Sequence, residues 1–177
     1  MTAVNTDTIT NTELFEKAVA FINETGIPCE SATLEHPTFL PGLDIQNGCI
    51  FYDKERMLYP GDILHEAGHL AVLSPSFRKE ACSPDKLSDN IDPGAAEMAA
   101  IAWSWAAICH LQIPAEFVFH PHGYKGASAS ILENFSRGHY FGVSMLQWLG
   151  MTKEAKHTIP ADEPAFPNMS HWLRQQD

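Results

Sequence analysis

The sequence predicts an α+β domain that is mostly helical and contains a small antiparallel sheet. Two stretches, one near the amino terminus and one near the middle, repeat their apolar residues at helical spacing. Between them, two short strand-like segments flank Asn47-Gly48, which is typical of a β-hairpin. At 177 residues with 45% hydrophobic content, the chain is long enough for one domain with a sizeable core.

The first helix is expected to begin at a cap formed by Asn11 or Thr12 and to run to about Glu24. Its apolar residues lie along one stripe, as expected for core packing. Gly26 and Pro28 end it, and residues 28–41 are predicted to be irregular.

A β-hairpin is expected next, with strands over Leu43-Asp44-Ile45 and Cys49-Ile50-Phe51-Tyr52. Asn47-Gly48 supplies the positive φ angles that a tight turn requires. The open edge of such a hairpin can pair with an extended peptide, but a purely structural hairpin fits the sequence equally well.

The most informative stretch is His65-Glu66-Ala67-Gly68-His69, in a helix expected to begin at Pro60-Gly61-Asp62. Histidines four apart share one helix face, so both imidazoles can reach a single ion. Glu66 can then act as a general base on a water molecule beside that ion, as in the H-E-x-x-H zinc motif. The alternative is two histidines on a solvated face beside an unrelated glutamate.

A third ligand is predicted on the next long helix, which opens with Asp92 as N-cap and Pro93 at the first helical position. Glu97 lies there among apolar residues, where a lone carboxylate is costly unless it is paired or binds a cation. Two histidines and one glutamate form an established ligand set of catalytic zinc. Alternatively, Glu97 lies on an exposed stripe that the helix dipole favours.

This arrangement resembles that of the gluzincin metallopeptidases. The stretch from Cys49 to Ile108 is similar to the small intracellular ImmA/IrrE-type metallopeptidase domains. The resemblance implies a zincin-like fold with the metal held between two helices, His65, His69 and Glu97 as ligands, and Glu66 as catalytic base. The metzincin extension is absent, because Val72 and Pro75 stand where its glycine and third histidine would be.

Two loops are candidates for further site residues. Within residues 74–92, Asp85, Asp89 and Asp92 are expected to form turns, or one of them to orient a zinc-bound imidazole.

In the second loop, over residues 117–126, His120, His122 and Tyr124 could donate hydrogen bonds to a developing oxyanion. Of these, His122 and Tyr124 are predicted to be catalytic. A plain surface loop with solvated histidines is the alternative. His139 and Tyr140 are weaker candidates, and His110 lies well round its helix from Glu97.

Short helices are expected over residues 128–135 and 138–149, and Gly150 ends the second of them. Residues 1–151 are predicted to form a single metallopeptidase-like domain. Residues 152–177 form a proline-rich tail whose late aromatics, Phe166 and Trp172, are expected to pack on the domain or on a neighbouring subunit. A homo-oligomer is therefore left open.

Composition excludes several classes of function. A net charge of −11 argues against nucleic acid as a partner. No stretch approaches the length of a membrane span, and Met1 to Asn11 lack the features of a secretory signal. The four cysteines form no C-x-x-C pair, so reduced thiols in a cytoplasmic protein are expected.

These observations predict a zinc-dependent hydrolase, most simply one that cleaves peptide bonds in a peptide or protein substrate. Another divalent metal, such as manganese, nickel or iron, suits the same ligands. The alternative is a non-catalytic domain in which the site has a structural or regulatory role. A catalytic site keeps one coordination position open, whereas a structural site is closed by protein.

Overall fold

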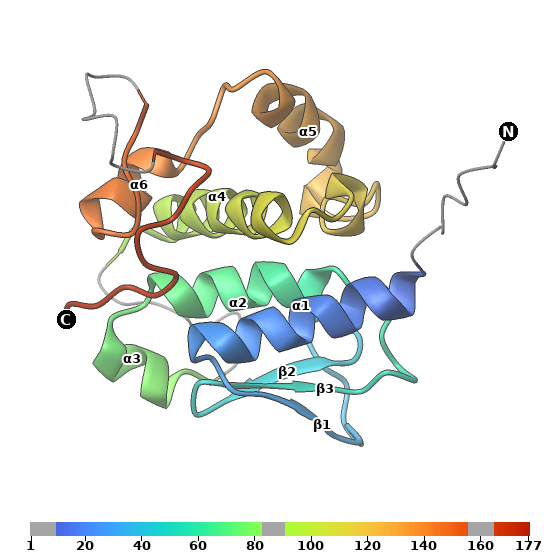
Figure 1. Cartoon of the computed structure of the whole chain (residues 1–177). Coiled ribbons are helices and arrows are strands. Elements are labelled where there is room, and N and C mark those ends of the chain that lie inside the picture. The colour runs from blue at the N-terminus through green and yellow to red at the C-terminus, as the bar shows by residue number, and fades with distance from the viewer. Residues whose placement is uncertain (1–9, 83–90, 156–164) are drawn as a thin grey trace, which may run out of the picture.

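The computed structural model describes residues 10–82, 91–155 and 165–177. The fold is mostly helical α+β, as predicted, with a small sheet (Figure 1). The helices and strands that build it, in chain order, are α1 (Asn11–Thr25), β1 (Cys29–Ser31), β2 (Leu43–Gln46), β3 (Cys49–Tyr52), α2 (Asp62–Val72), α3 (Pro75–Glu80), α4 (Pro93–Leu111), η2 (Ala115–Phe117), η3 (Tyr124–Gly126), α5 (Ser128–Ser136) and α6 (Val143–Trp148).

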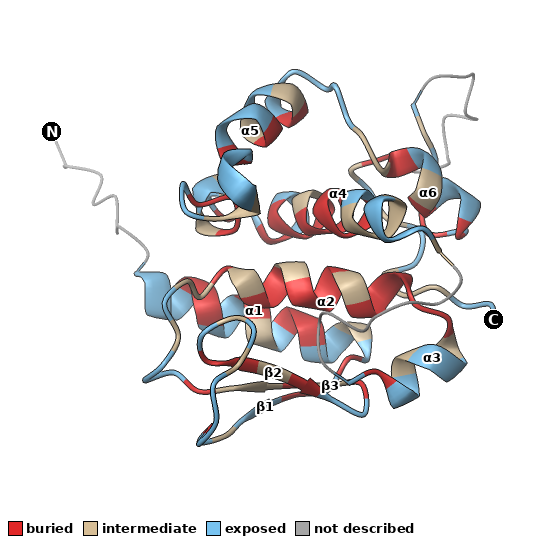
Figure 2. Ribbon diagram, turned by 180° about the vertical axis from the view of Figure 1, so that it is seen from behind, coloured by how far each residue is buried: buried red, intermediate tan, exposed pale blue. Residues whose placement is uncertain are grey.

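The elements are stacked in layers. α1 and α2 lie side by side over one face of the sheet, α4 packs on the other side of α2, and α5 and α6 lie beyond α4 (Figure 1). The surfaces that α2 and α4 turn toward each other are buried along most of their length (Figure 2). Among the described residues, no helix is long and apolar enough to cross a membrane.

The first helix has the extent and apolar stripe expected, but a different cap. The side chain of Thr10, rather than that of Asn11 or Thr12, accepts a hydrogen bond from the Glu13 amide, and Glu13 in turn accepts one from the Thr10 amide. This reciprocal capping box satisfies two donors that the helix leaves open. Gly26 ends the helix in a left-handed conformation, as predicted.

The sheet is mixed rather than purely antiparallel. β2 and β3 form the predicted hairpin, and Asn47 and Gly48 both have positive φ at its turn. The correction comes from Cys29–Ser31, which was expected to be irregular but pairs in parallel with β3. This strand is only three residues long, with one buried side chain, so its sequence carries no alternation from which it could be predicted.

Two further helix boundaries differ from prediction. The loop after α2 contains the short helix α3, which Pro75 begins at a position where its missing N–H costs nothing. The last helix, α6, starts at Val143 and not near residue 138, because Gly138 and Gly142 both take positive φ.

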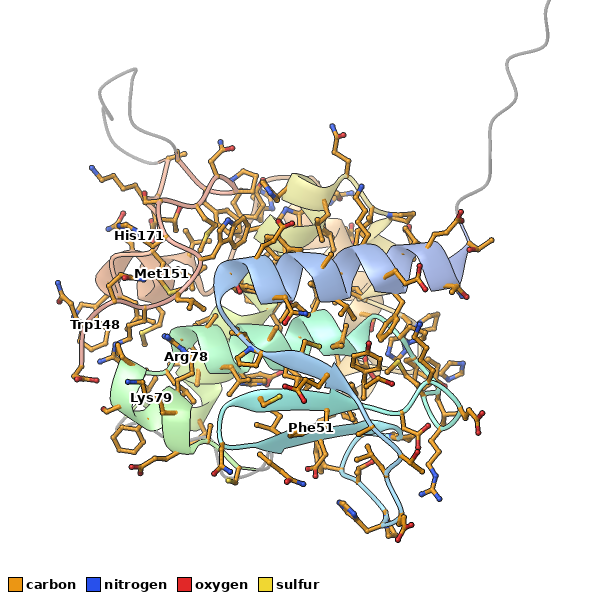
Figure 3. All side chains as sticks on the ribbon, turned by 60° about the horizontal axis from the view of Figure 1, so that its bottom comes forward. Phe51, Arg78, Lys79, Trp148, Met151 and His171 are labelled. Carbon is orange, nitrogen blue, oxygen red and sulfur yellow. The ribbon has the colours of Figure 1, made fainter. Side chains whose placement is uncertain are left out.

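The last described residues pack against α1, the middle of α4 and the segment after α6. The Trp172 ring contacts Phe21 of α1 and Trp103 of α4, and the Trp103 indole donates to the Trp172 carbonyl at 2.9 Å. The amides of Ser170 and His171 donate to the carbonyl of Met151, beside the end of α6 (Figure 3). The boundary between the domain and a tail at residues 151 and 152 stays a prediction.

Candidate metal centre

Helix α2 carries both histidines of the motif on the side that faces α4. The helix begins at Asp62, as predicted, and at Gly68 its backbone lies against the backbone of Ala100 in α4. A Cβ on Gly68 would lie 2.9 Å from the carbonyl oxygen of Ala100, so no larger residue fits without moving one helix. The glycine between the two histidines therefore allows the close helix pairing that the site requires.

Helix α4 supplies the third residue. Asp92 is its N-cap, accepting a hydrogen bond from the Ala95 amide at 3.0 Å, and Pro93 follows at the first helical position. This cap sets where the helix starts and so places Glu97 in its second turn, opposite α2. The three predicted ligands thus come together between two helices.

The donor atoms are spaced as a metal site requires. The Nε2 atoms of His65 and His69 are 3.1 Å apart. The carboxylate of Glu97 approaches them with its two oxygens, at 3.5 Å from His65 Nε2 and 3.1 Å from His69 Nε2. Ligand atoms about 2.0–2.1 Å from a tetrahedral zinc ion lie about 3.3 Å from one another, so the observed separations fit such an ion.

Charge and exposure at the three ligands also suit a cation. Hydrogen bonds from His65 and His69 hold the pKa of Glu97 well below its usual range, so the carboxylate stays ionised. Burial alone would lower the pKa of His65, but its hydrogen bond to Glu97 and the nearby carboxylates outweigh burial and raise it. The Glu97 side chain is 46% exposed against 13% for His65, so the centre is open to solvent on the α4 side.

The exposure of Glu97 corrects the reasoning that identified it. Its side chain is half-exposed, so burial in an apolar helix is not what makes a partner necessary. The exposed-stripe alternative describes its burial better, but that alternative does not account for the two imidazoles that converge on its carboxylate.

The side chain of Glu66 is buried in the interior of the protein. The residue is only 3% exposed, and its Oε2 is buried without a hydrogen-bond partner among the residues that the structure describes. Burial raises the pKa of its carboxyl, although the nearby imidazoles of His65 and His69 oppose the shift. A carboxylate with a raised pKa and one oxygen without a described partner is suited to accept a proton near neutral pH.

Tyr124 and His122, the other two predicted catalytic residues, are placed differently. The Tyr124 ring packs edge-on against the His65 ring, with centroids 5.1 Å apart. Its hydroxyl is buried, and no described residue forms a hydrogen bond with it. The His122 ring is exposed and lies against Tyr59 at 5.7 Å, so the structure brings Tyr124, but not His122, against a candidate metal ligand.

Burial keeps the Tyr124 hydroxyl protonated. Together with the negative charges of Asp62, Glu97 and Glu66, it raises the pKa of Tyr124 well above its usual value. The side chain is therefore a hydrogen-bond donor over the whole working range of a protein.

A buried acid–imidazole pair lies next to this turn. His120 Nε2 is 2.9 Å from Asp62 Oδ1, and both side chains are largely buried. Sequence reasoning treated Asp62 only as a helix start. A signal was present, however, because Asp62 precedes His65 by three residues and therefore shares its helix face.

The remaining candidates are not at the centre. Asp92 caps α4, as a turn former would, and Asp85 and Asp89 lie outside the described residues. The His110 ring packs against Phe21 and Trp172, far round α4 as expected.

His139 and Tyr140 also lie elsewhere. His139 is exposed, and the Tyr140 ring contacts Phe135 and Phe166. Neither residue has a described contact with the three ligands.

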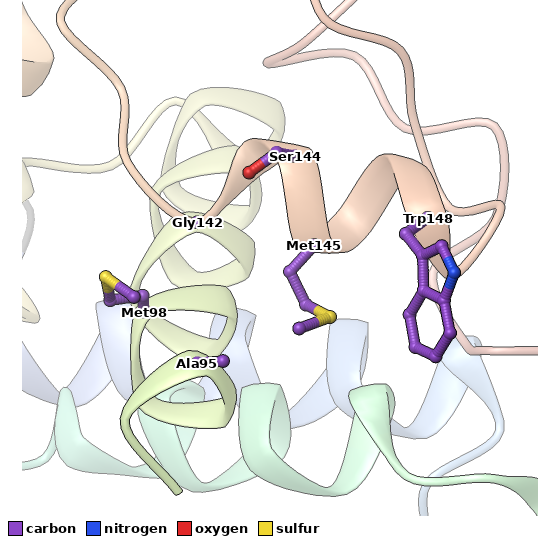
Figure 4. A pocket seen from close by; sticks show the side chains of 6 residues that line it. All are labelled: Ala95, Met98, Gly142, Ser144, Met145 and Trp148. Atoms are coloured by element: carbon purple, nitrogen blue, oxygen red, sulfur yellow. The ribbon is translucent and has the colours of Figure 1, made fainter. Parts of the chain in front are cut away.

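An apolar hollow of about 240 Å³ opens between α4 and α6. Its walls come from both helices and the residue before α6: Ala95, Met98, Gly142, Ser144, Met145 and Trp148 (Figure 4). It includes none of the three ligands, although Met98 is the neighbour of Glu97 in sequence. The hollow is therefore lined by residues other than the three candidate ligands.

Comparison of the chain with known protein families, curated proteins and solved structures finds no match. The triad of His65, His69 and Glu97, with both histidines on one helix, is what the structure adds to the resemblance noted in the sequence.

Proposed function

We propose that this protein is a zinc-dependent hydrolase and that it acts as a metallopeptidase. The observation that carries the proposal is the convergence of three donor atoms at tetrahedral spacing, with a buried and unpartnered glutamate next to the first ligand. A structural metal site has no use for Glu66, whereas hydrolysis needs a base at that position.

In this proposal His65, His69 and Glu97 hold the ion. When bound, zinc polarises a carbonyl group and lowers the pKa of a coordinated water toward about 7. Glu66 would take the proton of the attacking water as the new C–O bond forms, and would pass it to the leaving nitrogen as the C–N bond of the amide then breaks. The other metals that a His₂Glu ligand set suits, manganese, nickel or iron, would use the same residues.

Tyr124 is the proposed donor to the developing oxyanion. Its neutral hydroxyl is buried, and its ring packs directly against a ligand. A preorganised donor of this kind acts most strongly where water is excluded. His122 is the weaker proposal for the same role, because its exposed ring contacts Tyr59 instead.

The substrate class is supported by the sheet as well as by the ligands. β2 lies at an edge of the sheet, in the order β1-β3-β2. An extended peptide can pair with such an edge through main-chain hydrogen bonds, which a small non-peptide amide cannot do.

Glu66→Gln tests the proposal most sharply, because glutamine keeps the shape and removes the base. Zinc-loaded wild type should cleave members of a broad peptide library, and the variant should turn over about 10²–10⁴-fold more slowly. Its zinc content and circular dichroism should match those of the wild type. Glu133→Gln, on an exposed face of α5, is the matched control and should keep full activity.

Each of three outcomes would contradict part of the proposal. A pure, zinc-loaded wild type that cleaves no member of the library would remove the peptidase assignment. Equal turnover by Glu66→Gln and the wild type would remove Glu66 as the base. A metal site that holds zinc equally in both proteins, without turnover, would identify the non-catalytic alternative.

A further inference from the structure

The turn that carries Tyr124 contacts helix α2 at two places, the Tyr124 ring against the His65 ring and a buried contact of His120. His120, at the start of the turn, meets Asp62, at the start of α2, with 2.9 Å between Nε2 and Oδ1. The two side chains are 11% and 14% exposed. The Tyr59 ring stacks on the His120 ring at 3.9 Å and 11°, which covers the imidazole from solvent.

From these contacts we infer that Asp62 and His120 are a positioning pair that holds the Tyr124 hydroxyl beside the metal centre. The inference deepens the proposed function and rests on it, because it names what keeps the proposed oxyanion donor in place. Neither residue is assigned contact with substrate.

His120 organises the turn through its carbonyl and its ring. The His120 carbonyl accepts hydrogen bonds from the Ser128 hydroxyl at 2.7 Å and the Gly123 amide at 3.0 Å. A Cβ on Gly123 would lie 3.1 Å from the His120 ring, so the backbone closes tightly over that side chain. A shift of His120 would therefore move the whole turn.

The backbone of the turn requires a stabilising contact from another segment of the protein. Tyr124 and Lys125 have φ of +53° and +52°, which is the left-handed region that residues with a Cβ adopt at a cost. Two such residues in succession persist only when surrounding contacts hold them. The contact with Asp62 supplies that restraint from a rigid helix.

Asp62 lies on the same helix as the candidate ligand His65. It lies one turn before His65, whose ring the Tyr124 ring contacts. Asp62 and His65 are thus held one turn apart on α2, and the loop turn from His120 to Tyr124 contacts both of them. Such outer partners of a metal site orient the groups that do the chemistry.

The molecule contains a matched control for this pair. His36 and Asp44 also form an imidazole–carboxylate contact, at 3.4 Å, but the His36 side chain is 58% exposed. The Asp44 side chain is only 16% exposed and also accepts a hydrogen bond from the Gln46 side-chain amide, so the control change is made at the exposed imidazole. A pair with an exposed partner contributes little to stability or order, and His36→Leu should therefore leave the metal centre and Tyr124 unchanged.

The test is ¹⁹F NMR of the full chain labelled with 3-fluorotyrosine, which gives four signals, one for each tyrosine. Tyr124→Phe identifies the signal of Tyr124. His120→Leu removes the contact, and the Tyr124 signal should then move toward the solvent-exposed position and sharpen. His120→Gln, whose amide can donate from the place of Nε2, should restore it, and Asp62→Ala should repeat the effect from the other side.

The signals of Tyr52 and Tyr140 report on the rest of the fold and should stay in place. Tyr59 stacks on His120, so its signal is expected to move as well. A Tyr124 signal that is unchanged in folded His120→Leu or Asp62→Ala protein would overturn the inference. If His120→Leu fails to fold, Asp62→Ala decides the question alone, since it leaves the imidazole packed on Tyr59.

A second readout separates this inference from the proposed function. With a cleaved peptide, His120→Leu should lower kcat about 10–100-fold, with zinc content retained and with recovery in His120→Gln. An unchanged kcat in His120→Leu would contradict the inference. If the wild type cleaves nothing, the peptidase proposal fails, whereas the NMR result still decides whether the pair positions Tyr124.

Discussion

The two ends of helix α2 differ in how their polar groups are satisfied. At the amino half, His65 Nδ1 and Glu66 Oε2 are buried with no hydrogen-bond partner in the described part of the chain. At the carboxyl end, the last carbonyls have no amide donor within the helix. They accept hydrogen bonds from the Arg78 side chain and from the Arg174 amide instead. One helix thus has buried polar atoms without a described partner in its amino half, and carbonyls bonded by other segments at its carboxyl end.

Arg78 closes the carboxyl end. Its Nε donates to the Leu70 carbonyl at 2.9 Å, and its Nη2 donates to the carbonyls of Leu73 at 2.8 Å and Arg174 at 2.9 Å. The Arg174 amide donates in turn to the Ala71 carbonyl. The final carbonyls of a helix have no partners of their own, so these contacts satisfy groups that would otherwise destabilise the fold.

The difference shows which polar groups the fold uses for its own stability. A buried polar atom without a partner costs free energy, so a fold removes such atoms wherever it can. It has done so at one end of α2 and not at the other. The atoms left unsatisfied at the amino half belong to the residues of the candidate site: Glu66 Oε2, and His65 Nδ1, the ring nitrogen opposite the Nε2 that approaches Glu97.

The largest loss of zinc affinity is expected from substitution of a candidate ligand in α2. His69→Gln should weaken zinc binding more than about 100-fold, since loss of a direct ligand exceeds the usual cost of losing an outer-shell partner. His110→Gln, on α4 and away from the centre, is the control. Competition titration with a chromophoric chelator measures both, and equal affinities would remove His69 from the ligand set.

The carboxyl end should respond in stability and not in metal binding. Arg78→Ala leaves several helix-end carbonyls without their donor, so the free energy of unfolding should fall by about 1–3 kcal/mol. The neighbouring exposed Lys79→Ala should change it by less than about 0.5 kcal/mol. Urea denaturation of the metal-free proteins measures the difference, and loss of zinc by folded Arg78→Ala would break the division between the two ends.

The pH dependence of zinc binding should show the raised pKa of His65. A protonated imidazole cannot ligate, so affinity should fall as the pH drops through that pKa, starting above the ordinary value of about 6.5. Below it, each pH unit should cost at least about tenfold in affinity, because at least the proton on His65 must be displaced. Glu97 adds nothing in this range, because its pKa is lowered. A midpoint below pH 6 would contradict the raised pKa.

Much of this arrangement could be predicted from the sequence, and the reason is local geometry. Helical spacing fixes which residues share a face, so His65, His69 and the cap at Asp92 followed from positions alone. The prediction of Glu97 was right in placing it with the histidines, but it relied on a degree of burial that the half-exposed side chain does not have.

What the sequence did not reveal depends on contacts between distant segments. The parallel pairing of β1 with β3, the bond between Asp62 and His120, and the role of Arg78 each join residues from separate elements. No local pattern encodes such a contact. A three-residue strand and a short helix after a proline are likewise determined by the tertiary structure around them.

Metal content tests the central claim most directly. Elemental analysis should compare untagged wild type with Glu97→Ala and with the control Glu133→Ala after zinc loading and desalting. About one zinc per chain is expected in the wild type and the control, and little in Glu97→Ala. Absence of zinc from the wild type, or equal zinc in all three proteins, would contradict a metal centre formed by His65, His69 and Glu97.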